Sequence, residues 1–469
     1  MKKKWIALFL VFAMLATALV GCQVTTGTET PGEGETTTGD AAAPAADLEG
    51  RETITMWFWG TEPYAQEAMK AALIDPYNAS QDRYQLTVEY RPSVDSDMNT
   101  ALAANQGPDI VYGSGPAFVM PLVEAGKLEN MDKYSEQYGW KERLLEPYYE
   151  SGTVQGSLYS VPNGISTMGV FYNKKVLADN GWEVPTTIEE MEKIMDEALA
   201  KGLYASVTGN KGWKPVNENY ASVFLTHYAG PETVYKALKG EEKWENAKVK
   251  AAVEKSKEWW DKGYLAGKDY VNLNFSESLG LLADEKSPFF IGPTIAYQWA
   301  ASYFTGDKTE NFGFFPFPAT AEVPNETYTL GAACTFSING NVADDHKDEA
   351  AKIIDRMLQP EFTQIITTAW PGYWGTPLKD LTTIDTSEMG YLSTEFIETV
   401  KKVSAAVNEG NFGFYTNVFF PAATQQEFVN IEEVWYDTID VDSYLQRIDK
   451  TFDEELQKGL VPPIPQPAF

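Results

Sequence analysis

The chain has 469 residues, and its 37 Lys and Arg against 67 Asp and Glu give a formal net charge of −30. Nucleic acids and anionic membrane surfaces are bound through clustered Lys and Arg, so this balance argues against both as partners. The length exceeds that of one ordinary domain, and we expect about two lobes with a large apolar core.

The N-terminus has the pattern of a bacterial export signal. Lys2–Lys4 precede an uncharged apolar run, 5–20, which is followed by Gly21 and Cys22. A signal peptide has this order of charge, apolar run and small residue, and the run is short for a membrane span. Residues 19–22, Leu-Val-Gly-Cys, form a lipobox, in which the new N-terminal cysteine is diacylated. We therefore predict a signal peptide at 1–21 and a lipid anchor at Cys22.

The segment after Cys22 is rich in Thr, Gly, Glu, Pro and Ala as far as Gly50. Such a composition cannot bury enough apolar surface to offset the entropy of ordering. We expect residues 22–50 to be a lipidated cysteine on a flexible tether, which places the protein at the outer face of the cytoplasmic membrane. With Cys22 acylated, Cys334 has no partner for a disulfide, and we expect it to be small buried filler.

The folded region opens with a strand. Ile54, Met56 and Phe58 alternate with the aromatic residues Trp57 and Trp59, and this period of two is typical of a β-strand. Trp57 and Trp59 should therefore share one face.

Helical and extended patterns alternate after this strand. In chain order we expect a helix over 63–74, a strand over 86–90, a helix over 98–104 and a strand over 109–112. Alternation of this kind predicts a largely parallel sheet with helices on both faces, where ligands bind beyond the carboxyl ends of the strands. The loops 57–62 and 112–116 should then lie at one edge of a cleft.

Three later helices are indicated. Thr187 and Glu190 form a capping box before an apolar helical repeat that lasts until Gly202. Similar periodicity predicts helices over 247–262 and 346–358.

The groups that most catalytic or metal sites require are missing. His227 and His346 are the only histidines, and His346 lies in a charged turn that is typical of a solvated helix start. No zinc-binding spacing is present. A partial calcium pattern beginning at Asp95 lacks the required Gly and final Glu, and the Gly113-Ser114-Gly115 turn lacks the Lys of a phosphate-binding loop. We therefore expect no catalytic residues, no metal and no cofactor.

Aromatic residues beside Gly and Pro are instead concentrated in several loops. They are Trp57-Phe58-Trp59-Gly60, Lys211-Gly212-Trp213-Lys214-Pro215, Trp299, Trp370-Pro371-Gly372-Tyr373-Trp374-Gly375 and Asn411-Phe412-Gly413-Phe414-Tyr415. A sugar ring has apolar C–H faces and a belt of hydroxyls, so a saccharide site needs flat aromatic surfaces with polar groups at their edges. The same aromatic residues could also fill the cores of the lobes.

The order of several motifs resembles family 1 extracellular solute-binding proteins, the carbohydrate-binding components of ABC importers that are similar to maltose-binding protein. The resemblance is carried by Gln106-Gly107-Pro108-Asp109-Ile110, Ala125-Gly126-Lys127-Leu128, Leu158-Tyr159-Ser160-Val161-Pro162-Asn163, Gly169-Val170-Phe171-Tyr172-Asn173-Lys174, Val184-Pro185-Thr186-Thr187, Phe290-Ile291-Gly292-Pro293 and Ala350-Ala351-Lys352-Ile353-Ile354. It covers essentially all of residues 51–460. The loops around Trp213, Trp374 and Tyr415 depart from the family, so only the class of ligand carries over.

The resemblance implies an α/β fold of two periplasmic-binding-protein-like lobes, each a mostly parallel sheet flanked by helices. We expect lobe 1 to contain 51–163 plus 335–379, and lobe 2 to contain 164–334 plus 380–469. The crossing segments are placed near 161–166, 330–335 and 377–382.

The resemblance further implies that the lobes close on a ligand and that the closed form docks on membrane permease subunits. Ten residues are our candidates for ligand contacts: Trp57, Trp59, Glu62, Asn163, Trp213, Trp299, Trp370, Tyr373, Trp374 and Tyr415. Asp109, a hallmark of the family, begins a strand after Gly-Pro, and we expect it to cap a turn. So many aromatic surfaces favour an oligosaccharide, bound by a monomer.

Three alternatives remain open at this level. The same fold could bind a peptide or a polyamine, since an acidic aromatic cleft also suits cations. A surface glycoside hydrolase would need only two carboxylates, which an acidic chain always offers. An adhesin would hold polysaccharide without changing shape.

Overall fold

The computed structural model describes residues 48–60 and 62–469. The predicted signal peptide, Cys22 and nearly all of the tether lie outside the described residues. Among the described residues, no helix is both long and apolar enough to cross a membrane.

The first lobe is built on a five-stranded sheet. Its strands are β1 (Glu52–Phe58), β2 (Tyr84–Tyr90), β3 (Ile110–Gly113), β6 (Val161–Pro162) and β12 (Thr335–Ile338). Their order is β2-β1-β3-β12-β6. β1 is parallel to both β2 and β3, as expected, whereas β12 is antiparallel to β3 and to β6.

Helices and one hairpin complete this lobe. They are α1 (Pro63–Met69), α2 (Asp75–Ala79), α3 (Val94–Ala103), α4 (Pro116–Glu124), α5 (Asp132–Tyr138), α6 (Trp140–Arg143), α7 (Glu146–Ser151), β4 (Thr153–Val154), β5 (Ser157–Leu158), α15 (Asp344–Met357) and α16 (Pro360–Ala369). The helix predicted over 63–74 continues to Ala79 because a π turn, Lys70–Ile74, joins α1 to α2. This wider turn precedes Pro76, whose missing N–H would break the regular hydrogen-bond ladder.

The second lobe contains two three-stranded sheets. One has the order β10-β8-β9, with β8 (Met168–Asn173) between β9 (Phe289–Pro293) and β10 (Phe312–Pro316). The other has the order β13-β11-β7, with β11 (Tyr328–Ala332) between β7 (Ile165–Ser166) and β13 (Phe412–Phe414).

The strand directions in this lobe correct one expectation. β8 is antiparallel to both of its neighbours, and only the β11–β13 pair is parallel. The prediction of a mostly parallel sheet is therefore wrong for the second lobe. The segment between β8 and β9 returns to the end of the sheet at which β8 finished, so β9 runs back along β8.

The helices of the second lobe surround these sheets. They are α8 (Lys174–Asn180), α9 (Ile188–Ala200), α10 (Val216–Phe224), α11 (Pro231–Leu238), α12 (Ala247–Asp261), α13 (Ser278–Ala283), α14 (Tyr297–Ala300), α17 (Tyr391–Asn408), α18 (Thr416–Phe419), α19 (Ala422–Val429), α20 (Glu432–Trp435) and α21 (Val441–Gln457). A π turn, Leu225–Ala229, follows α10, and 3-10 turns occur at Gly267–Asp269, Thr294–Ala296 and Gly306–Asn311. The predicted capping box of Thr187 and Glu190 is confirmed at the start of α9.

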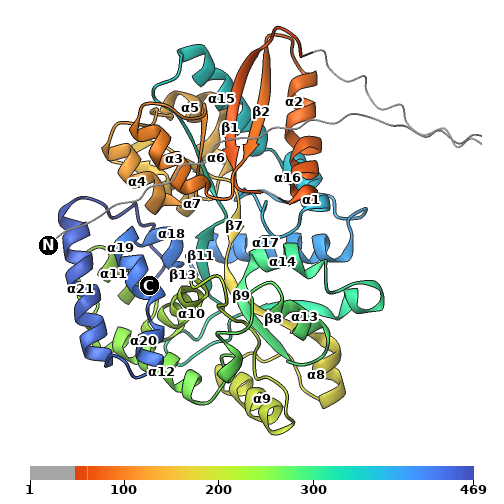
Figure 1. Ribbon diagram of the computed structural model, residues 1–469, viewed down its shortest axis with the longest axis vertical. Helices are drawn as coiled ribbons and strands as arrows, with labels where there is room; N and C mark the ends of the chain where they lie inside the picture. Colours follow the sequence, from red (N-terminus) through yellow and green to blue (C-terminus); the bar gives the residue numbers. More distant parts are fainter. Residues whose placement is uncertain (1–47, 61) are drawn as a thin grey trace, which may run out of the picture. The chain divides into compact units, whose positions relative to one another are not determined.

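The chain passes between the two lobes in adjacent segments. β6 leads through Asn163 and Gly164 into β7, and β11 leads through Ala333 and Cys334 into β12 (Figure 1). The Asn163 amide donates to the Cys334 carbonyl at 3.2 Å, and the Ala333 amide donates to the Gly164 carbonyl at 2.7 Å. A Cβ on Gly164 would lie 2.5 Å from the carbonyl oxygen of Tyr373, so only glycine fits at this crossing.

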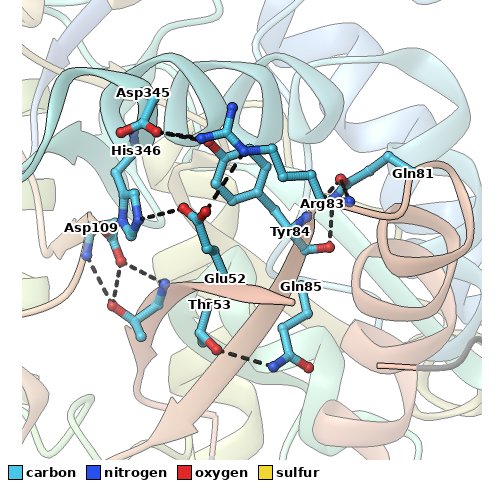
Figure 2. A network of polar contacts seen from close by, with 10 residues as sticks. Glu52, Thr53, Gln81, Arg83, Tyr84, Gln85, Asp109, Asp345 and His346 are labelled. Atoms are coloured by element: carbon cyan, nitrogen blue, oxygen red, sulfur yellow. Dashed lines mark hydrogen bonds and ion pairs between the residues drawn. The ribbon is translucent and has the colours of Figure 1, made fainter. Parts of the chain in front are cut away.

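Asp109 has a structural role, but the expectation that it caps a turn is wrong, because its partners lie in β1 and α15. Its carboxylate accepts hydrogen bonds from the Thr55 amide at 2.7 Å and the Thr55 hydroxyl at 2.6 Å. Its other oxygen lies 2.7 Å from Nδ1 of His346, which also faces Glu52 (Figure 2). His346 therefore joins the start of α15 to β1 and β3, and it is less solvated than the charged sequence around it suggests.

Candidate ligand-binding site

A cavity of about 660 Å³ lies between the two lobes. This volume is within the range of about 300–1,000 Å³ that is usual for small-molecule sites. The wall from the first lobe is formed by Trp59, Pro92, Ser93, Val94, Asp95, Ser96, Tyr112 and Ser114, together with Tyr373. Trp59, the segment 92–96 and Ser114 follow directly after β1, β2 and β3. The cavity thus lies at the carboxyl ends of these three strands, where we expect a ligand to bind.

The opposite wall comes from the second lobe. It contains Trp213, Asn274, Phe275, Ser276, Pro293, Ile295, Trp299, Tyr415 and Asn417, while Ser166, Ala332 and Ala333 line the cavity where the chain crosses between lobes. Trp213 and Trp299 both meet Phe275 edge to face, with ring centroids 5.1 and 5.8 Å apart. These three rings form a continuous apolar surface.

The cavity brings together five of the ten predicted contact residues, Trp59, Trp213, Trp299, Tyr373 and Tyr415. The indole N–H of Trp59 is buried and has no hydrogen-bond acceptor among the described residues. Trp213 is 38% exposed, more than any other tryptophan that lines the cavity. Its ring face is therefore accessible to a bound molecule.

Tyr415 is held tightly in the wall. Its hydroxyl donates to Asn219 Oδ1 at 2.6 Å. Its ring lies on β11, where a Cβ on Gly331 would be 2.8 Å from Tyr415 Cδ1. Burial raises the pKa of the Tyr415 hydroxyl well above its usual value.

The other predicted residues do not line the cavity. The guanidinium of Arg91 covers the ring of Trp57 at 3.5 Å from the centroid, and Glu62 is exposed at the start of α1. Asn163 is buried at the crossing, where its Oδ1 accepts a hydrogen bond from the thiol of Cys334 at 2.6 Å. Trp370 and Trp374 are fully buried.

Trp370 and Trp374 support the wall from behind. The rings of Trp370 and Tyr373 stack with centroids 5.1 Å apart and an interplanar angle of 9°. Trp374 stacks on Phe58 at 5.4 Å and meets Tyr373 at 5.2 Å. The aromatic loop predicted to contact ligand as a unit therefore presents only Tyr373 to the cavity, because the two indoles fill the core of the first lobe.

Asp95 is the charged side chain of the cavity lining, and it was not among the ten residues predicted from the sequence. Its Oδ1 is buried without a partner among the described residues, and burial raises its pKa to about 6. Its position one turn beyond β2 was the available signal, since the carboxyl ends of strands supply the site in such sheets. The described lining contains no Lys, Arg or His.

No group of three or more His, Cys, Asp or Glu is arranged to hold a metal ion within the described part of the chain. The cavity therefore offers rings, hydroxyls, amides and one carboxylate, which are groups for binding.

The comparison with protein families identifies the chain. Residues 72–390, well over half of its length, match the family model described as bacterial extracellular solute-binding protein. The chain belongs to this family. The resemblance inferred from the order of motifs is thereby confirmed, and the family is one of binding proteins.

Known relatives of this solute-binding protein match over shorter stretches. The maltotriose-binding protein of Pyrococcus abyssi is 25% identical over 166 residues, 34% of this chain and 33% of that protein. The diacetylchitobiose binding protein NgcE of Streptomyces coelicolor is 26% identical over 133 residues, 27% of this chain and 28% of that protein. The aligned part thus spans about a third or less of each relative's own length.

Solved structures match over nearly the whole solute-binding protein. A chitin oligosaccharide binding protein has a TM-score of 0.72 at 16% identity, over 86% of this chain and 99% of its own. The sugar-binding protein MalE from Xanthomonas citri has a TM-score of 0.69 at 18% identity, over 87% of this chain and 98% of its own. These likenesses confirm the two-lobed α/β fold.

Proposed function

We propose that this protein is the lipid-anchored receptor of an ABC importer and that it captures a neutral oligosaccharide between its lobes. The observation that carries the proposal is the cavity itself. Aromatic rings stand on both of its walls, Trp59 and Tyr373 on one side and Trp213, Trp299 and Tyr415 on the other. Rings on opposite walls suit the apolar faces of successive sugar units.

The charge of the lining narrows the ligand class. Asp95 supplies a hydrogen-bond acceptor, and no cationic side chain of the described lining would offset the charge of an acidic sugar. A carboxylated ligand would therefore be repelled by Asp95 in a site of low dielectric. The names of the relatives, which concern maltotriose and diacetylchitobiose, support neutral saccharides as the first ligands to test.

We place the hinge where the chain crosses between the lobes, at Asn163–Gly164, at Ala333–Cys334 and near 377–382. Lobe 1 then contains 51–163 plus 335–379, and lobe 2 contains 164–334 plus 380–469. Closure would bring the two aromatic walls together on the ligand. A ligand drives such closure only through contacts that are better in the closed form. The closed lobes would then dock on permease subunits, while the lipid on Cys22 keeps the receptor close to them.

Titration calorimetry of the mature protein tests this function. Maltotriose, diacetylchitobiose, raffinose and xylotriose form the saccharide panel, with spermidine and a short peptide as rival ligands. Binding of at least one saccharide is expected, accompanied by compaction in small-angle scattering. The rival with a specific basis is spermidine, since aromatic rings and Asp95 also suit a cation; binding of spermidine alone would overturn the proposal, and so would release of reducing ends from a saccharide.

A further inference from the structure

Glu218 on α10 is a buried carboxylate that has no cationic partner among the described residues. It is 1% exposed, and its contacts are with neutral side chains. Gln425 Nε2 donates to its two oxygens at 2.9 and 3.1 Å, and the Thr416 hydroxyl donates at 3.2 Å. Burial nevertheless raises the pKa of Glu218 to about 7. A carboxylate in such a place lowers the stability of the fold, so its presence requires another explanation.

The explanation lies in the fourth contact of Glu218. Asn417 Nδ2 donates to Glu218 Oε1 at 3.4 Å, and Asn417 lines the cavity. Above pH 7 the carboxylate of Glu218 is ionised and only accepts hydrogen bonds, so it selects the amide orientation in which Nδ2 faces Glu218. The Oδ1 of Asn417 is then directed away from Glu218, and it accepts no hydrogen bond from the described residues.

Other residues of α10 hold the neighbours of Asn417. Asn219 Oδ1 accepts the hydroxyl of Tyr415 at 2.6 Å, and the Ser222 hydroxyl accepts the amide of Thr416 at 3.1 Å. Residues 218, 219 and 222 lie at helical spacing on one side of α10. This side of the helix therefore fixes three consecutive residues, 415–417, in the cavity wall.

We propose that Glu218 is a positioning residue for ligand recognition: its buried carboxylate fixes the amide of Asn417 so that Oδ1 serves as a hydrogen-bond acceptor for a hydroxyl of the ligand. The inference rests on the proposed function for the identity of the ligand as a saccharide. On this inference, Asn417 of the second lobe accepts a hydrogen bond from one ligand hydroxyl, and Asp95 supplies an acceptor from the first lobe.

The Glu218→Gln substitution tests this role, because it keeps the shape of the side chain. Its amide oxygen can still accept from Gln425 and Thr416, but its amide nitrogen then faces Nδ2 of Asn417. Asn417 must lose this hydrogen bond or turn its own amide around, which exchanges the acceptor for a donor in the cavity. At pH 8, where Glu218 is ionised, we expect the Kd for the best saccharide of the panel to rise about tenfold, as for the loss of one hydrogen bond that involves a charged group.

A matched control is Asp449→Asn. Asp449 is another buried carboxylate of the second lobe, 8% exposed, and it accepts from the amides of Trp244 at 2.6 Å and Glu245 at 3.2 Å, away from the cavity. This variant should keep the wild-type Kd within about twofold, because no cavity residue depends on it. Equal losses of affinity in Glu218→Gln and Asp449→Asn would show a general loosening of the lobe and would overturn the proposal.

A double-mutant cycle with Asn417→Ala tests whether Glu218 affects binding through Asn417. Asn417→Ala alone should weaken binding about as much as Glu218→Gln, and adding Glu218→Gln to it should change the Kd no further. Additive losses, or an unchanged Kd in Asn417→Ala, would contradict the inference. The Kd of Asn417→Ala tests the inference even if Glu218→Gln fails to fold.

Amide hydrogen exchange supplies a measurement that needs no ligand. The amides of residues 416–419 should exchange faster in Glu218→Gln than in the wild type, and at the wild-type rate in Asp449→Asn. If the wild type binds none of maltotriose, diacetylchitobiose, raffinose and xylotriose, the proposed function fails by itself. Unchanged exchange in Glu218→Gln would separately refute the positioning role.

Discussion

Val418 of the second lobe packs against Gly115 at the start of α4 in the first lobe. A Cβ on Gly115 would lie 3.2 Å from Val418 Cγ1 and 3.3 Å from its Cα, and Val418 is fully buried. The chain neighbours of this pair, Ser114 and Asn417, both line the cavity. The contact therefore lies next to the cavity and links two of its lining residues to the packing between the lobes.

The Gly115→Ala substitution should hinder closure. The added methyl group would press on Val418, whose backbone cannot move without shifting α18. We expect the affinity for saccharide to fall by about tenfold, equivalent to about 1.4 kcal/mol. Small-angle scattering should show less compaction at saturating ligand.

Gly126→Ala is the control for backbone strain in this comparison. Gly126 also has a positive φ, 63°, yet nothing lies within 4 Å of a Cβ built on it. Gly126→Ala should lower stability by roughly 1–2 kcal/mol, the cost of a left-handed conformation for Ala. Gly115→Ala should lower it by roughly 1–3 kcal/mol, because the φ of 147° and ψ of −179° at Gly115 belong to a region that almost only glycine adopts. If Gly126→Ala reduced affinity as strongly as Gly115→Ala, the contact with Val418 would have no special role.

The sequence predicted the first lobe better than the second, for a physical reason. β1 and β2 carry apolar alternation and β3 is a short apolar run, and these patterns are local. The capping box of Thr187 and Glu190 is also contained in a few neighbouring residues. The direction of β9 beside β8 depends on more than a hundred intervening residues, so no local pattern encodes it. The order of motifs predicted the two-lobed fold, because these motifs are spread over nearly the whole folded region.

In the candidate site as well, the neighbouring sequence did not predict which aromatic side chains line the cavity. Trp213 and Trp374 look alike in the sequence, since each stands beside Gly in an aromatic loop. One is 38% exposed at the cavity and the other is fully buried against Phe58. Trp374 does not line the cavity because it stacks on Phe58 of β1, more than three hundred residues away in the chain. The residues next to either tryptophan do not encode such a distant contact.

Substitutions of these two tryptophans should separate binding from stability. Trp374→Ala removes a fully buried indole, and such changes cost about 3–5 kcal/mol, so its melting temperature should fall markedly. Trp213→Ala removes a ring that is partly exposed, and its free energy of unfolding should change by less than about 1 kcal/mol. Its affinity for saccharide should nevertheless fall at least tenfold in calorimetry. Normal binding by Trp213→Ala would remove this ring from the proposed site.

The pH dependence of stability should reveal the burial of Glu218. Its pKa rises from 4.5 to about 7 because burial opposes ionisation. The raised pKa means that the neutral carboxyl is favoured in the folded state, so its contribution is complete below pH 4.5 and is lost as the pH rises through 7. At about 1.4 kcal/mol for each pH unit, the loss is about 3 kcal/mol.

The Glu218→Gln variant should therefore gain stability relative to the wild type as the pH rises from 4.5 to 8. Urea unfolding at several pH values measures this difference. The combination of greater relative stability with weaker saccharide binding is expected of a residue kept for function. If the difference in unfolding free energy between Glu218→Gln and the wild type stayed constant over this pH range, burial would not raise the pKa of Glu218 as we expect.

The anchor is tested by Cys22→Ala. Cys22 is the proposed site of acylation, and the cavity is formed by residues 59–417 of the folded region, so the two should be independent. Cells that express Cys22→Ala should release the protein into the medium or the periplasm, with an unchanged Kd for saccharide. Retention of this variant in the membrane fraction would contradict a lipid anchor at this residue.

Asp95→Asn should change which sugars the cavity accepts. The carboxylate of Asp95 carries the charge of the lining, and its pKa is raised to about 6 by burial. At pH 7.5 the wild type should bind a neutral oligosaccharide and reject the corresponding uronic acid, whereas Asp95→Asn should reduce this preference by at least tenfold. Binding of the neutral sugar by the wild type should weaken as the pH falls through 6, since a protonated carboxyl is a poorer acceptor. In Asp95→Asn the step near pH 6 should disappear, and a step that persisted there would assign the titration to another group.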